Sequence, residues 1–262
     1  MSVTGMNAGD IILINNGTRN NIFWQKALRK KSSVNATHVA LSLGEGAFIH
    51  ADTSCGVGFA YFPDLLVDSK GRWKVIRNKE VNSDFEEKIE KAGVFHFNKT
   101  YNYGFLLKEN EKSLFCSQLV DLVYKSVGVD IFDRNKTKSL LTLNNAFPVD
   151  FEELLIKDGR WCEVSNVYQD NLNNGFIELQ RTNFLMRQAL IMSERNTRKF
   201  HSDMLDLVNA LNESHNLLPK EFKSTELETH LSEMITGLNE SESAFFYNFW
   251  DIRSNKNRQV MS

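Results

Sequence analysis

Cys116 lies at a position where a cysteine can become a nucleophile. The segment 113–128 carries apolar residues at helical spacing, so Cys116 falls in the first turn of a predicted helix. There its sulfur faces free backbone N–H groups and the positive end of the helix dipole, which stabilise a thiolate. A buried structural cysteine is the other interpretation, because free cysteine is among the most buried residue types.

Two histidines supply the groups that a cysteine nucleophile needs. His38 belongs to a predicted strand over 37–43 and His50 to a returning strand over 47–51, joined by a turn at 44–46. This hairpin places the two side chains opposite each other or nearly so, although a slip of one residue would send one to the other face. A nucleophile requires a nearby base and a group that orients the base. We therefore expect His38 to be the base, paired with the Cys116 thiolate, and His50 the orienting residue.

Three further side chains are candidates for contact with a substrate. Tyr101 and Tyr103 lie in an aromatic, turn-like segment, and Gln118 follows Cys116 in the predicted helix. We expect these three residues to bind substrate in a cleft beside Cys116, with surface packing as the alternative for the tyrosines.

Metal binding is a competing interpretation of the histidines and the cysteine. All three are zinc-ligand types, but their wide separation along the chain fits no common structural zinc site. We therefore expect neither a metal nor a cofactor.

The order of the predicted elements indicates an α+β fold and two domains. We expect residues 1–175 to form the catalytic domain and residues 176–262 a helical extension, because strand signals stop near residue 175. The predicted strands are 11–14, preceded by a Gly9-Asp10 turn, 37–43, 47–51, 56–59, 73–77 and 161–164. The predicted helices are 21–31, 83–97, 116–128, 148–155, one long helix or a helical pair over 176–217, 225–236 and 242–253, and a polar loop covers 136–145.

Composition excludes several classes of protein. The 262 residues carry 31 basic and 33 acidic side chains, so we expect no nucleic acid or anionic membrane as a necessary partner. The three cysteines form neither a disulfide framework nor a CxxC pair. No basic region precedes the short apolar run at 11–14, and no run approaches about 18 apolar residues. We expect a protein made in the cytoplasm without a signal peptide or transmembrane segment, whose export would need a dedicated secretion system.

Four segments together resemble a known family. They are GDIILI, THVALSLGEGAFIHAD, GVGFAYF and FCSQLVDLVYKSVGV, in that order along residues 8–165. Their order is similar to that of the circularly permuted NlpC/P60 papain-like superfamily, in which the histidine strand precedes the cysteine helix. The related lecithin:retinol acyltransferase-like proteins share this order and a similar gap between the two histidines.

The resemblance implies a fold and a chemistry. A helix bearing Cys116 would pack on an antiparallel sheet bearing both histidines. Cys116 would match the nucleophile, His38 the base and His50 the third polar residue. The family implies cofactor-free acyl transfer through a thioester, with the Cys116 N–H stabilising the oxyanion. The NCE-type signature of the acyltransferases is absent, since Phe115-Cys116-Ser117-Gln118 stands in its place, which favours an amidase or peptidase.

The leading hypothesis is a cysteine hydrolase, a thiol protease or amidase acting on cell-wall (peptidoglycan) peptides. Because such peptides lie outside the cytoplasm, this hypothesis needs either delivery by a secretion system, as for an antibacterial toxin or effector, or a cytoplasmic substrate. The alternative is a lipid-directed acyltransferase, thioesterase or phospholipase of the same fold, and a third is a non-enzymatic zinc-binding or scaffold protein. For the C-terminal helices we consider a packing extension, a lid, or a docking surface for a secretion-system partner or an inhibitor protein.

Overall fold

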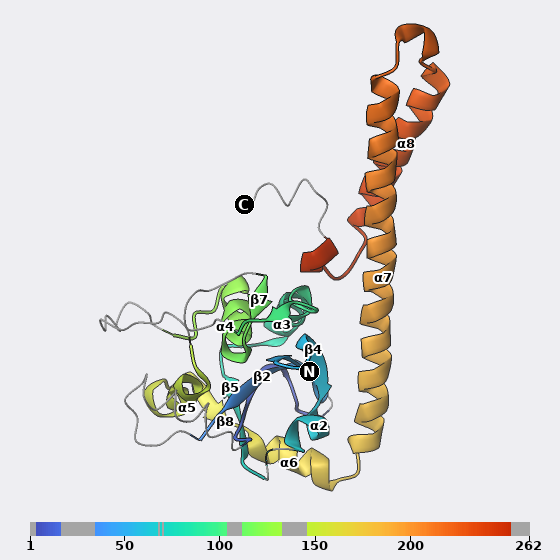
Figure 1. Cartoon of the computed structure of the whole chain (residues 1–262). Helices are drawn as coiled ribbons and strands as arrows, with labels where there is room; N and C mark the ends of the chain where they lie inside the picture. Colours follow the sequence, from blue (N-terminus) through green and yellow to red (C-terminus); the bar gives the residue numbers. More distant parts are fainter. Residues whose placement is uncertain are drawn as a thin grey trace, which may run out of the picture. The chain divides into compact units, whose positions relative to one another are not determined.

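A computed structural model describes residues 4–16, 35–67, 69, 71–103, 112–132 and 146–252. The chain forms two compact units, Met1–Arg187 and Gln188–Ser262. The predicted helix over 21–31 and the predicted loop over 136–145 lie outside the described residues. Figure 1 shows the elements, which are named below as they are labelled there.

The first unit contains a six-stranded sheet in which neighbouring strands are antiparallel. The strand order is β4-β3-β2-β1-β5-β8. This sheet, with helices on it, confirms the expected α+β papain-like fold class. The strands are β1 (Ala8–Ile14), β2 (His38–Gly44), β3 (Ala47–Asp52), β4 (Gly56–Tyr61), β5 (Trp73–Asn78) and β8 (Trp161–Glu163).

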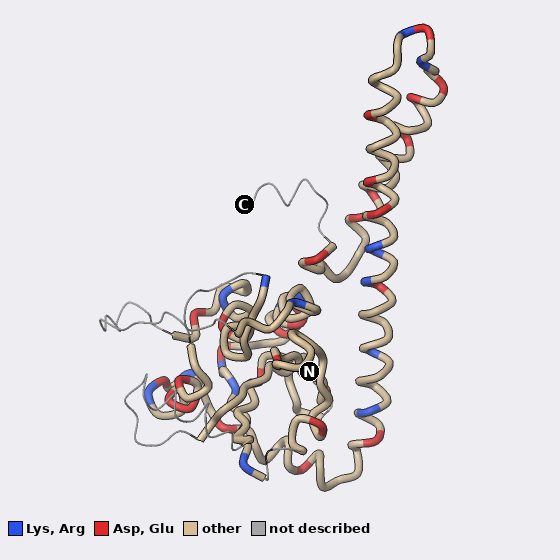
Figure 2. Tube along the Cα trace, viewed as in Figure 1, with Lys and Arg blue, Asp and Glu red and all other residues tan. Residues whose placement is uncertain are grey.

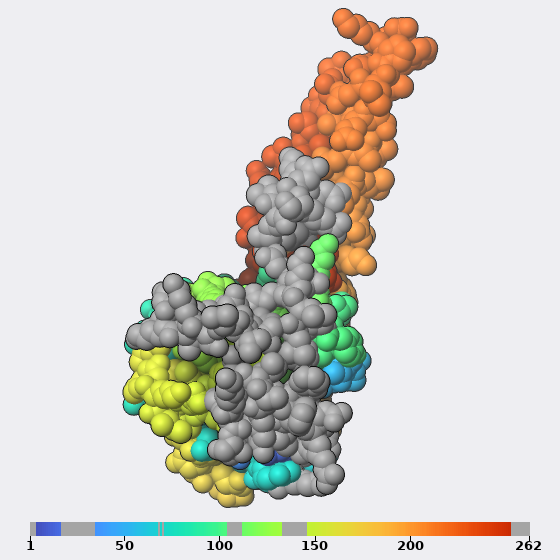
Figure 3. All heavy atoms as spheres, turned by 60° about the vertical axis from the view of Figure 1, so that its left-hand side comes forward, coloured from blue at the N-terminus to red at the C-terminus, as the bar shows by residue number. Residues whose placement is uncertain are grey.

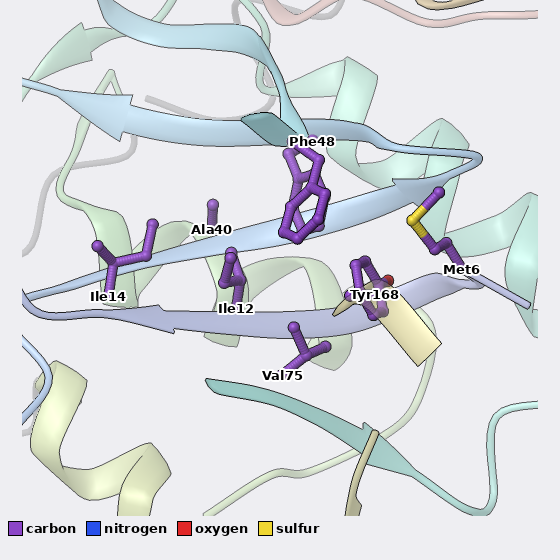
Figure 4. Close-up of a cluster of buried hydrophobic side chains, with 8 residues drawn as sticks. Met6, Ile12, Ile14, Ala40, Phe48, Val75 and Tyr168 are labelled. Atoms are coloured by element: carbon purple, nitrogen blue, oxygen red, sulfur yellow. The ribbon is translucent and has the colours of Figure 1, made fainter. Parts of the chain in front are cut away.

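Apolar side chains cover both faces of the sheet, because helices pack on each. On one face, Phe62 of α2 (Phe62–Leu66) and Tyr168 of α6 (Ser165–Asn173) join a buried cluster drawn in Figure 4. On the other face lie α3 (Ser83–Phe95) and α4 (Cys116–Ser126). The strand members of the first cluster are Ile12, Ile14, Ala40, Phe48 and Val75.

The sequence prediction was wrong for Gly9, which lies within a strand rather than in a turn. β1 begins at Ala8, and its pairing with β2 shifts between Ala8 and Ile11, which is the signature of a β-bulge. Gly9 has φ +93°, and a Cβ there would lie 2.9 Å from Ile89 of α3. The Tyr124 hydroxyl of α4 donates a hydrogen bond to the Gly9 carbonyl. The bulge therefore allows both α3 and α4 to pack closely against β1.

A buried ion pair ties three elements together beside the bulge. The Arg77 guanidinium of β5 donates to both carboxylate oxygens of Asp10, each at 2.6 Å, and also to the Gly5 carbonyl. The Tyr168 hydroxyl of α6 donates to the same carboxylate at 2.7 Å. Asp10 is only 1% exposed, so these donors replace its water shell.

A small parallel pair of strands leads the chain into α4. β6 (Thr100–Tyr101) pairs with β7 (Ser113–Leu114) close to β3 and β4. At Gly56 the first residue of β4 passes so near the segment before β6 that a Cβ would lie 2.3 Å from the Lys99 carbonyl oxygen. The Val57 N–H donates to the same oxygen at 2.8 Å. Glycine at position 56 therefore allows β6 to lie against β4.

The second unit is a helical hairpin. Its longer helix begins before the boundary, within the last residues of the first unit. The predicted region 176–217 forms one helix, α7 (Ile177–Asn216), and the helix predicted over 225–236 extends further as α8 (Thr225–Glu242). α8 runs back along α7, and the atoms of the two helices form a continuous rod in Figure 3. α7 carries both acidic and basic residues, whereas the charged side chains of α8 are acidic, without a lysine or arginine (Figure 2). None of the helices described has the length and apolar character needed to span a membrane.

The predicted helix over 242–253 was wrong. The segment 244–249 is irregular and ends in a short 3-10 turn, Trp250–Ile252. Its backbone bonds to side chains of α7, since Glu194 accepts from the Tyr247 N–H and Arg198 donates to the Tyr247 carbonyl. Phe249 is fully buried. Packing of the aromatic residues thus determines the local structure instead of their helical spacing.

We expect the Asp10→Ala variant to lower the free energy of unfolding by about 3 kcal/mol, because the substitution leaves the Arg77 charge without its partner. Chemical denaturation followed by circular dichroism measures the loss. Glu87→Ala, which removes an exposed ion pair with Lys91, is the matched control and should change the stability by less than about 1 kcal/mol. Equal effects of the two substitutions would contradict the structural role of Asp10.

Candidate active site

Cys116 is the first residue of α4, as the sequence predicts. Phe115 before it is extended, with φ −106° and ψ 167°, and its side chain makes no capping hydrogen bond. The first turn of α4 also lacks an acidic residue. Among the residues that the structure describes, no capping side chain and no first-turn carboxylate therefore neutralises the N–H groups of the first turn of α4. These N–H groups favour negative charge on the Cys116 sulfur or on a substrate oxygen beside it.

The Cys116 sulfur lies against the sheet at the beginning of β2. It forms a hydrogen bond with the backbone of Val39, the residue that follows His38, and lies 3.9 Å from the Ser117 hydroxyl. The side chain is 7% exposed. Burial raises the pKa of the thiol, and the hydrogen bonds from Val39 and Ser117 only partly oppose this increase.

The two histidines contact each other directly. Nε2 of His38 lies 3.0 Å from Nδ1 of His50, and the rings meet edge to face at an angle of 80°. The register Leu41 with Ile49 in the β2–β3 pair, continued along the strands, places the histidines diagonally on one face. The hairpin geometry expected from the sequence therefore brings these two side chains together.

Loss of hydration determines the charge state of the two partly buried histidines. Burial and repulsion from a charged His50 together lower the pKa of His38 to about 3, although Asp52 opposes the decrease. Burial likewise lowers the pKa of His50, with Asp52 again opposing. In the free protein at neutral pH, burial favours a neutral thiol and neutral imidazoles over the ion pair expected from the sequence.

The hydrogen bond between the histidines limits which nitrogen can act as a base. Because Nε2 of His38 is engaged by His50, only Nδ1 remains to take a proton from another group. For Nδ1 to carry the lone pair, Nε2 must carry the hydrogen and donate to Nδ1 of His50. His50 is therefore placed to fix the tautomer of His38.

The two tyrosines lie together near the cysteine. Burial raises the pKa of Tyr101, and so do the nearby charges of Cys116 and Asp52, which places its hydroxyl close to both groups. The ring of Tyr103 lies 5.1 Å from that of Tyr101, and its hydroxyl donates to the Thr53 carbonyl at 2.6 Å. Tyr103 is 71% exposed, so the two rings form an aromatic wall that reaches solvent.

Gln118 has a different environment. Two residues along an α-helix correspond to a rotation of about 200°, so its side chain leaves α4 on another side than that of Cys116. It is 6% exposed, and its Oε1 has no hydrogen-bond partner in the described parts of the chain. The geometry thus groups the tyrosines with Cys116 and does not group Gln118 with them.

Asp52 is a member of this region that the sequence reasoning missed. It ends β3 two residues after His50, and its Oδ1 accepts hydrogen bonds from the N–H and the hydroxyl of Ser54. The available signal was the two-residue spacing, since residues 50 and 52 of one strand share a face. No group of three or more His, Cys, Asp or Glu side chains within the described ranges is placed to hold a metal ion.

Comparison with protein families is decisive for the first unit. Residues 5–170, well over half of the chain, match the model of the permuted papain-like amidase enzymes of the C92 family, YaeF/YiiX. The chain belongs to this family of permuted papain-like amidases. Membership makes the protein a papain-like hydrolase of the amidase or peptidase class, and the resemblance proposed from the sequence is confirmed.

Other known proteins add little to this family match. The crystal structure of the metalloprotein yiiX from Escherichia coli O157:H7 aligns with a TM-score of 0.39 and 17% sequence identity. The alignment covers 47% of this amidase-family chain and 67% of the yiiX chain. The search of curated proteins finds no match.

The burial of His38 predicts a loss of stability in acid. Its pKa is about 3 in the folded protein and 6.5 when exposed, so between these values only the unfolded chain binds the proton. The free energy of unfolding should therefore fall as the pH drops from 6.5 toward 3. Chemical denaturation at several pH values measures this slope.

The control for that experiment is a pair of variants. His38→Gln should flatten the slope, with His50 retaining part of it, whereas His230→Gln on the exposed surface of α8 should leave the slope unchanged. An unaltered slope in His38→Gln would show that His38 is accessible to protons in the folded protein.

Proposed function

We propose that the protein is a cysteine amidase or peptidase in which Cys116 is the nucleophile, His38 the base and His50 the orienting residue. The observation that carries the proposal is the 3.0 Å contact between the histidines, at the beginning of β2, where the Cys116 sulfur meets the Val39 backbone. Membership in the permuted papain-like amidases supports the class of reaction.

In this proposal the proton of the Cys116 thiol passes to Nδ1 of His38 as the sulfur attacks an amide carbonyl carbon. The N–H groups at the tip of α4, that of Cys116 among them, stabilise the oxyanion. The C–N bond then breaks, and the leaving amine takes the proton from His38. Water attacks the thioester with His38 again as base, which releases the acid and restores the thiol.

Neutral groups at rest suit this sequence of steps. A neutral His38 can accept the thiol proton at once, and charge separates only when an electrophilic carbon is present to receive the sulfur. Burial then strengthens the attraction between the new imidazolium and the developing negative charge. In the proposed site the thiolate therefore forms together with its attack on a bound substrate and is not present beforehand in the free protein.

For the substrate we propose a peptide amide, with cell-wall peptides as the specific candidate. The wall formed by Tyr101 and Tyr103 supports an extended peptide as the ligand, because tyrosines offer flat apolar contact with a hydrogen-bonding tip. A cell-wall substrate implies delivery as an antibacterial effector through a secretion system. That the helices of the second unit bind a delivery partner or an inhibitor stays a prediction.

The proposed thiol activation is tested with a thiol-reactive probe at pH 7 and peptide-resolved mass spectrometry. We expect Cys116 to react in preference to the exposed Cys55 and the half-buried Cys162, and to lose this preference in His38→Ala. His50→Ala should reduce the rate roughly tenfold or more, since the tautomer of His38 is no longer fixed. Preferential labelling that persists without His38 would remove the proposed base.

The substrate class is tested by incubating the protein with purified muropeptides and, separately, with phospholipid vesicles. Products that depend on Cys116 and appear only with muropeptides would support the amidase proposal. Products only from the vesicles would replace it with the lipid-directed alternative. The Cys116→Ala variant is the control in both experiments, and it should lower product formation by at least about a thousandfold.

A further inference from the structure

Asp52 occupies a position from which it can act on both histidines. It follows His50 by two residues on β3, so its side chain leaves the strand on the same face. The register of Leu41 with Ile49, continued along the pair, places Asp52 opposite His38 on β2. The carboxylate thus lies beside the two rings that would carry positive charge during the proposed reaction.

The carboxylate is held in place by its own turn. The Ser54 N–H donates to its Oδ1 at 2.8 Å and the Ser54 hydroxyl at 2.6 Å. The turn is fixed from outside by Tyr103, whose hydroxyl donates to the Thr53 carbonyl. The two Ser54 donors fix the orientation of the Asp52 carboxylate and stabilise its negative charge without a cation beside it.

The titratable groups that interact with Asp52 come from three elements. They are His50 on the same strand, His38 on β2 and Tyr101 on β6. Burial alone raises the pKa of Asp52, but the Ser54 hydrogen bonds and the two histidines lower it below its ordinary value. Asp52 therefore carries a negative charge at neutral pH and raises the pKa of each imidazole.

We propose that Asp52 is a positioning residue whose carboxylate stabilises positive charge on the His38–His50 pair, so that the four residues act together as Cys-His-His-Asp. The inference rests on the proposed function and extends it. When the thiol proton moves to Nδ1 of His38, the site gains one imidazolium and one thiolate and its total charge stays the same. Asp52 offsets the imidazolium, whereas the main influences on Cys116 are burial and hydrogen bonds from Val39 and Ser117.

The test uses Asp52→Asn, because an asparagine Oδ1 can still accept both Ser54 hydrogen bonds while the charge is lost. The rate at which iodoacetamide alkylates Cys116 is measured from pH 5 to pH 10 (roughly the range over which thiols and imidazoles titrate), with Cys162 in the same molecule as reference. We expect a rate about tenfold lower at pH 7 and a midpoint about one pH unit higher than in the wild type.

Three further variants separate an effect of the Asp52 charge from an unspecific effect or a loss of folding. Asp64→Asn, on the exposed side of α2, should leave the alkylation profile unchanged. Asp52→Glu keeps the charge on a longer side chain and should give a profile between those of the wild type and the asparagine variant. If Asp52→Asn does not fold, Ser54→Ala answers the question, since it keeps the charge and removes one of its two hydrogen bonds and should raise the midpoint by a smaller amount.

An Asp52→Asn profile identical to the wild type would overturn the inference and leave Asp52 as a turn residue only. A folded Ser54→Ala variant with an unchanged midpoint would overturn it equally when the asparagine variant does not fold. Failure of the proposed function looks different, because alkylation of Cys116 would then be insensitive to His38→Ala in an otherwise wild-type chain.

Discussion

Loss of hydration at a buried thiol and two partly buried imidazoles is the constraint on which the candidate site depends. Cys116 is nearly buried at the tip of α4, and burial is the largest influence on its pKa and on those of His38 and His50. An isolated charge on any of them is costly, whereas a pair of opposite charges formed together costs much less. The fold therefore has to supply fixed partners for charges that exist only during the proposed reaction.

Several contacts fix the helix that carries the sulfur. The bulge at Gly9 lets Tyr124 of α4 bond to the backbone of β1, and the next residue, Asp10, anchors β5 and α6 through Arg77 and Tyr168. The site and the buried ion pair thus share β1 as their support. A larger residue at position 9 would push α3 away from β1 and strain the bulge, which would disturb the packing of α4 against the histidine strands. This is a physical reason for glycine at that position.

The parts of the molecule that sequence reasoning predicts well depend on short-range order. The histidine hairpin closes within twelve residues, and the helix at Cys116 has a regular apolar face, so both were predicted correctly. Gly9 was misread because a Gly-Asp pair usually marks a turn. α6 was missed because its sequence is mostly polar, with Tyr168 as its one fully buried apolar residue and Val167 and Leu172 packed against the core while partly exposed. Asp52 was missed because its importance arises from the ring of His38, which belongs to another strand.

The turn between β3 and β4 connects the features on which the proposed chemistry depends. Asp52 begins this turn and receives two hydrogen bonds from Ser54, Thr53 accepts the hydroxyl of Tyr103, and Gly56 allows the segment before Tyr101 to lie against β4. The charge beside the histidines and the aromatic wall beside the cysteine are therefore built on the same short turn. In the proposed reaction, a substrate that contacts Tyr103 would therefore act on the turn that holds Asp52, which would couple substrate contact to stabilisation of the imidazolium. Such coupling links charge separation to an occupied site, which is where a buried thiolate would be useful and where water would otherwise compete.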